Sequence, residues 1–180
     1  MASLTSIDLQ TRLSLSPHQW QFEEADNRHD LNWLMTRVAL TARGRPMRQI
    51  RTRLVSWEFH SLVTSCSDLA SHRMAAWRSR LLDSGLHLWI DRTSDRGDVF
   101  RVVVLASGIG GALPVDFEPN WQGDYLAEPG SSLWGIRAYC SAAALGLFAR
   151  ELDDELQSFP VRAFQRAKHG KPLRQGVDSV

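Results

Sequence analysis

Apolar residues recur at every second position in the first third of the chain, which is the pattern of half-buried β-strands. One such stretch covers residues 7–15 and is ended by Pro17, and a second covers residues 32–42. A turn at Gly44 leads into a third stretch over residues 47–55. The second and third strands are therefore expected to form an antiparallel hairpin.

Two later segments change to apolar spacings of three and four residues, which predicts helices. The first helix is expected from residue 57 to about 70, with Ser56 as its N-cap. The second is expected over residues 142–158, capped by Ser141 and stopped by Pro160. The apolar stripes of the two helices are Phe59, Leu62, Val63, Cys66, Leu69 and Ala70, and Leu145, Phe148, Leu152, Leu156 and Phe159.

Three apolar, β-rich stretches predict strands in the second half of the chain, over residues 86–91, 99–106 and 132–140. A shorter strand is expected over residues 113–117, followed by a long loop at 118–131 that is rich in proline, glycine and acidic residues. The strands follow one another without the alternation of strand and helix that builds a parallel sheet. We therefore predict an α+β fold, in which one antiparallel sheet of about six to seven strands packs against the two helices.

Basic and acidic residues are unevenly divided between the body of the chain and its C-terminal end. After Pro160 there are five basic residues and one acid, whereas residues 1–160 contain sixteen basic residues and nineteen acids. The segment 163–180 also lacks apolar periodicity, so we expect a single domain over residues 1–162 and a basic, disordered tail over 163–180. No apolar run approaches the roughly 18 residues of a membrane helix, and no secretory signal is visible, which predicts a cytoplasmic protein.

Residues that could carry chemistry do not fall into a spacing typical of an active site or metal centre. Gly108, Gly110 and Gly111 are not expected to bind phosphate, because a strand rather than a helix is predicted after them. The six histidines show no metal-ligand spacing, and Cys66 and Cys140 are interpreted as buried thiols. We therefore predict no catalytic, cofactor or metal site, and a protein that is not an enzyme.

An arginine cluster is the strongest indication of nucleic-acid binding. It consists of Arg43, Arg45, Arg48, Arg51 and Arg53. On a strand, Arg51 and Arg53 would share one face while Arg48 points to the other, so we expect only a short basic stripe, diluted by neighbouring acids. Nucleic-acid modules are usually basic over their folded part, whereas the body of this chain is acidic, so nucleic-acid binding is disfavoured.

Acidic residues form the more coherent candidate surface, on the outward face of the last predicted helix and in the predicted 113–131 region. One interpretation is an ordinary solvated surface. The functional interpretation is a docking surface for a basic partner protein, because clustered charge steers association and aromatic residues can anchor the contact. The candidate partner-binding residues are Glu151, Asp153, Asp154, Glu155, Asp116, Glu118, Trp121, Asp124, Tyr125 and Glu128.

The order of several motifs resembles that of a known family. These motifs are the strand opening Asp30-Leu-Asn-Trp-Leu with Thr36-Arg-Val-Ala-Leu, the helix opened by Ser56, the paired strands 86–91 and 99–105, and the closing helix that ends in Phe159-Pro-Val-Arg. Together they span residues 18–162 and are similar to the WapI-like immunity proteins, small bacterial antitoxins partnered with contact-dependent polymorphic toxins. Within the first motif, Trp33 is expected in the core, and Asn32 is expected to cap an element or form a turn.

The resemblance implies a non-catalytic immunity protein that binds and neutralises a cognate toxin domain, without a cofactor. Two other interpretations stay open at this point. One is an α+β protein-interaction module, with a homodimer as one form. The other is a nucleic-acid accessory protein that uses Arg43–Arg53 and the basic tail.

Overall fold

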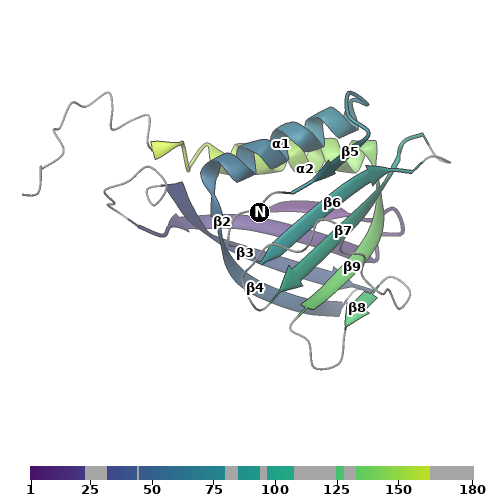
Figure 1. The fold of residues 1–180 in the computed structure, drawn as a ribbon, viewed down its shortest axis with the longest axis horizontal. Helices are drawn as coiled ribbons and strands as arrows, with labels where there is room; N and C mark the ends of the chain where they lie inside the picture. The colour runs from purple at the N-terminus through teal and green to yellow at the C-terminus, as the bar shows by residue number, and fades with distance from the viewer. Residues whose placement is uncertain are drawn as a thin grey trace, which may run out of the picture.

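A computed structural model describes residues 1–22, 32–43, 45–79, 85–93, 97–107, 125–127 and 133–162. Within these ranges the chain forms strands and two helices in an order that matches most of the predicted elements (Figure 1). The elements are β1 (Ala2–Thr5), β2 (Thr11–Trp20), β3 (Trp33–Ala42), β4 (Arg45–Val55), α1 (Ser56–Ala70), β5 (Ala76–Arg78), β6 (Leu86–Arg92), β7 (Val99–Ser107), β8 (Tyr125–Ala127), β9 (Leu133–Ser141) and α2 (Ala142–Leu156).

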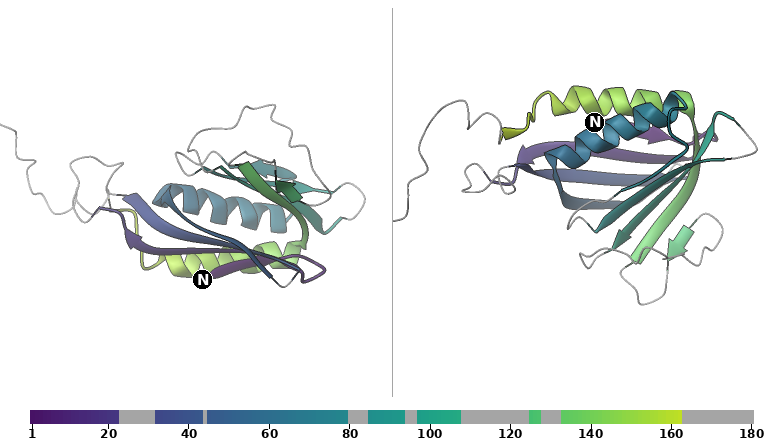
Figure 2. Two further views of the ribbon diagram at one scale, coloured as in Figure 1. Left: turned by 90° about the horizontal axis from the view of Figure 1, so that it is seen from below. Right: turned by 45° about the horizontal axis from the view of Figure 1, so that its top comes forward.

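The α+β class with two packed helices is confirmed, but the strands divide between two antiparallel sheets. The N-terminal sheet has the order β1-β2-β3-β4, and the C-terminal sheet has the order β5-β6-β7-β9-β8. Figure 2 shows α1 lying between the two sheets. A single sheet of six to seven strands was expected, because alternation within each strand does not reveal that α1 separates two pairing groups.

The inner faces of both sheets and the apolar stripes of both helices share one core. The buried stripe residues of the helices include Phe59, Leu62 and Cys66 on α1, and Phe148 and Leu152 on α2, as predicted. Figure 1 shows the two helices side by side, covering the strands. Neither helix in the described ranges has the length and apolar character needed to span a bilayer.

The predicted first strand over residues 7–15 is wrong, because a turn interrupts it. The backbone N–H of Ser6 donates to the carbonyl of Thr11 at 2.8 Å, and the side chains of Ile7 and Leu9 are 52% and 80% exposed. A tight turn can preserve the parity of apolar residues, so alternation alone does not detect it. Pro17 also does not end the strand: β2 continues past it through a bulge between Pro17 and Gln19.

One expectation in the second half of the chain needs correction, and several others fall outside the described residues. The predicted loop 118–131 contains the short strand β8, whose residues pair with Trp134–Ile136 of β9. Three residues are too few to show a period. The predicted strand over residues 113–117, the glycines at 108–111 and the tail 163–180 lie outside the described residues.

The two helices begin differently. Ser141 caps α2 as predicted, since its Oγ accepts a hydrogen bond from the backbone N–H of Ala144 at 3.1 Å. The N-cap of α1 is Val55 rather than Ser56. The Glu58 carboxylate accepts the N–H of Val55 at 2.8 Å, which leaves Ser56 free to bond elsewhere in the structure.

Candidate functional site

The acidic helix face, defined as Glu151, Asp153, Asp154 and Glu155 of α2, lies beside the N-terminal sheet. The side chain of Asp154 is exposed, and those of the other three are partly buried. The four carboxylates therefore differ in solvent exposure and do not form one uniform surface.

Two of these carboxylates hold the first strand in place. The Glu151 carboxylate accepts the backbone N–H of Ser3 at 2.9 Å, and the Glu155 carboxylate forms an ion pair with the amino group of Met1. β1 is the edge of its sheet, and a helix carboxylate that accepts an edge N–H satisfies a donor that would otherwise face outward. Asp153 and Asp154 are therefore the members of the face that remain for another molecule.

The other candidate partner-binding residues are only partly covered by the structure. Asp116, Glu118, Trp121, Asp124 and Glu128 lie outside the described residues. Tyr125 begins β8 and pairs with Ile136 of β9. Of these residues the structure describes Tyr125 alone, which it places on an edge strand of the C-terminal sheet.

The nucleophilic and metal-ligating residue types serve structural roles or lie apart. Cys66 and Cys140 are free and buried, and burial raises the pKa of the Cys66 thiol and raises that of Cys140 to about 12. Such thiols stay protonated and are poor nucleophiles. His72 Nε2 lies 3.1 Å from Asp98 Oδ1 on an exposed surface, and the described ranges contain no group of three potential metal ligands.

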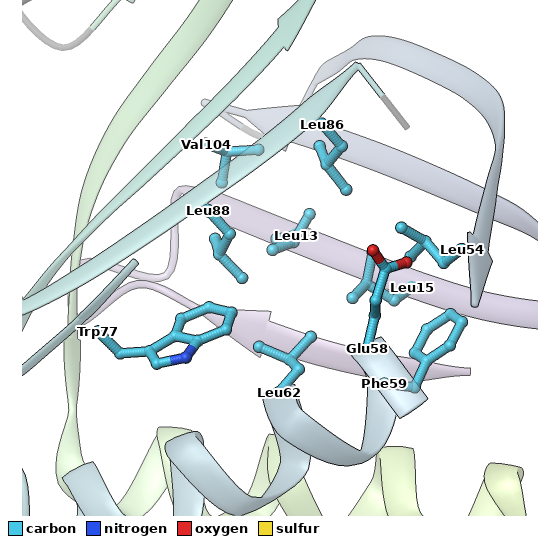
Figure 3. Close-up of a pocket in the computed structure, with 10 residues that line it drawn as sticks. All are labelled: Leu13, Leu15, Leu54, Glu58, Phe59, Leu62, Trp77, Leu86, Leu88 and Val104. Atoms are coloured by element: carbon cyan, nitrogen blue, oxygen red, sulfur yellow. The ribbon is translucent and has the colours of Figure 1, made fainter. Parts of the chain in front are cut away.

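A space between the two sheets, under α1, is lined by core side chains (Figure 3). The one carboxylate in its lining is Glu58, which is 6% exposed and already accepts the N–H of Val55. Few polar groups are placed there to orient a ligand, so we interpret it as part of the core. The lining residues are Leu13, Leu15, Leu54, Glu58, Phe59, Leu62, Trp77, Leu86, Leu88 and Val104.

The outer side of the N-terminal sheet carries a second charged surface, the arginine face, defined as Arg12, Arg37, Arg51 and Arg53. All four side chains are exposed. Arg37 of β3 lies directly opposite Arg51 of β4. The four strands β1, β2, β3 and β4 contain no aspartate or glutamate, so no acid within this sheet dilutes the stripe.

Sequence reasoning missed this face because it considered the 43–53 arginines alone. The signal was present in the predicted hairpin. Arg37 and Arg51 stand the same number of residues before and after Gly44, so a hairpin turning there places them opposite each other. Arg12 joins the same face through the pairing of β2 with β3.

Comparison with protein families adds the deciding observation. The model of the Immunity protein WapI-like family matches residues 3–160. The chain belongs to this family. No curated protein and no solved structure matches the chain. The matched region runs from β1 to just beyond α2, so WapI-like membership applies to both sheets and both helices.

The residues that carry the resemblance have structural roles in this WapI-like chain. Trp33 is buried, as predicted, and the Arg53 guanidinium lies 5.8 Å from the centre of its ring. Asn32 is fully buried, and its Oδ1 accepts hydrogen bonds from the Ser56 hydroxyl at 3.1 Å and from the Arg162 N–H at 2.9 Å. Both residues of the motif therefore stabilise the packing of the fold.

Proposed function

We propose that this protein binds a cognate toxin domain and neutralises it without catalysing a reaction. Membership of the WapI-like immunity family carries this proposal. The reactive groups of the described chain support it, because the thiols are buried and protonated and Glu58 is engaged in capping a helix. We expect the protein to act in the cytoplasm, where a toxin domain that has entered the cell would reach its target.

The acidic helix face supplies one part of the proposed contact. Asp153 and Asp154 remain for the toxin, since Glu151 and Glu155 hold β1. Clustered negative charge raises the association rate with a cationic protein. We also propose that the acidic residues Asp116, Glu118, Asp124 and Glu128 contribute to this contact, with Trp121 and Tyr125 as aromatic anchors.

Affinity capture tests the proposal. The purified full chain is immobilised, a lysate of the source cells is passed over it at moderate salt, and retained proteins are identified by mass spectrometry. The C-terminal domain of a large secreted polymorphic protein should be retained. That domain, purified separately, should form a stable complex with the chain. Retention of nucleic acid, or of this chain alone, would contradict the proposal.

A further inference from the structure

The arginine face is a cationic surface built by three neighbouring strands. Arg12 comes from β2, Arg37 from β3, and Arg51 and Arg53 from β4. Arg37 lies between Ser16 and Arg51 across these strands. The neighbouring residues Val38 and Thr52 are buried, whereas the four arginine side chains are exposed, so the arginines point away from the core.

Arg37 and Arg51 have no ion-pair partner among the residues that the structure describes. The four strands of the sheet contain no carboxylate side chain. Like charges directly opposite each other destabilise a sheet. Two exposed arginines elsewhere in the described ranges do have a carboxylate partner: Arg73 pairs with Asp68 at 2.6 Å and Arg101 with Asp91 at 2.7 Å. The unpaired, opposed arginines therefore fit a surface whose counter-charge comes from another molecule.

The composition of the face favours a protein over a nucleic acid. Its exposed arginines are interspersed with the half-buried side chains of Met35 and Ala39. Arginine and methionine are enriched at protein interfaces. Nucleic-acid modules are usually basic over their folded part, whereas the body of this chain has more acids than bases.

We propose that the arginine face binds an acidic surface of a partner protein, which under the proposed function is the toxin domain itself. Each guanidinium can form two parallel hydrogen bonds with one carboxylate. The toxin would then meet the arginine face with acidic residues and the acidic helix face with basic ones. Two contacts of opposite sign allow only one orientation of the complex, because any other orientation places like charges together.

Binding to immobilised poly-L-glutamate tests this inference without the toxin. The full chain is compared with Arg37→Gln/Arg51→Gln, and with a control, Arg73→Gln/Arg150→Gln, which removes the same charge elsewhere and keeps the same tail. The first pair should weaken binding about tenfold at low salt, and the control less than about twofold. Circular dichroism should show the same fold for all three proteins, because Arg37→Gln/Arg51→Gln removes a repulsion and the control removes only an exposed ion pair of Arg73.

A duplex DNA and a single-stranded RNA of about 20 nucleotides serve as competing probes in the same assay. Equal weakening by both pairs, or no weakening by either, would overturn the inference. So would tighter binding of a nucleic acid than of poly-L-glutamate, lost specifically in the Arg37→Gln/Arg51→Gln variant. Failure of the toxin-capture experiment leaves this assay unaffected, so the two proposals fail separately.

Discussion

The Asn32 side chain accepts a hydrogen bond at 2.9 Å from the backbone N–H of Arg162, which lies 130 residues further along the chain. The same oxygen accepts the Ser56 hydroxyl at the start of α1. One buried amide therefore joins the beginning of β3, the beginning of α1 and the segment that follows α2. The Asn32-Trp33 motif therefore has a structural role in this fold.

Replacing Asn32 with alanine should destabilise the protein by about 2–3 kcal/mol, because the buried Ser56 hydroxyl and the Arg162 N–H both lose their acceptor. Urea unfolding followed by tryptophan fluorescence measures the change. The control is Gln49→Ala, at an exposed position of β4, which should alter the free energy of unfolding by less than about 0.5 kcal/mol. A loss below that value for Asn32→Ala would show that the junction contributes little.

The Glu151→Ala variant should loosen the edge strand β1, since the N–H of Ser3 loses the carboxylate that accepts it. We expect a loss of about 1 kcal/mol and faster hydrogen exchange at the β1 amides. Asp154→Ala, on the same helix but exposed, is the matched control and should change neither quantity. Unchanged exchange in Glu151→Ala would mean that β1 is held by its pairing with β2 alone.

The Arg51→Glu variant should stabilise the fold, because it converts a like-charge pair with Arg37 into an attractive pair. The expected gain in the free energy of unfolding is at most about 1 kcal/mol, and it should shrink as salt is added. Arg51→Gln should give a smaller gain. Denaturant unfolding at low and high salt provides the measurement, and a destabilised Arg51→Glu protein would contradict the proposed repulsion.

Reversing the charge of Asp153 and Asp154 to lysine should weaken binding of the toxin domain mostly through the association rate. A decrease of about tenfold at low salt is expected, with little change in dissociation or in thermal stability. Stopped-flow mixing with the purified domain resolves the two rates. An association rate unchanged at low salt would remove these two residues from the contact.

The sequence predicts those parts of the fold that depend on local periodicity. The stripe containing Leu145, Phe148 and Leu152 and the β3–β4 hairpin are examples, because each repeats its pattern over many residues. The turn after Ser6 escapes prediction because it preserves the alternation of apolar residues. The N-cap falls on Val55 because Glu58 accepts the Val55 N–H while the Ser56 hydroxyl donates to Asn32, a residue distant in the sequence. The division into two sheets depends on long-range pairing that no local pattern encodes.

The candidate surfaces too could be predicted only in part from the sequence. The acids of the last helix are visible in the sequence, but their attachment to Ser3 and Met1 is not, because it needs the packing of α2 beside β1. The arginine face could have been derived by extending the hairpin register from Arg51 to Arg37. The four strands of this sheet contain no acidic residue, and this becomes visible only once the strands are known to form one sheet.

The most direct test of the central claim is the residual activity of the captured toxin domain as this protein is titrated against it. We predict that activity falls to the background level near one equivalent and that inhibition appears without any chemical change in the toxin. A toxin domain that keeps its full activity in the presence of excess, properly folded protein would contradict the account.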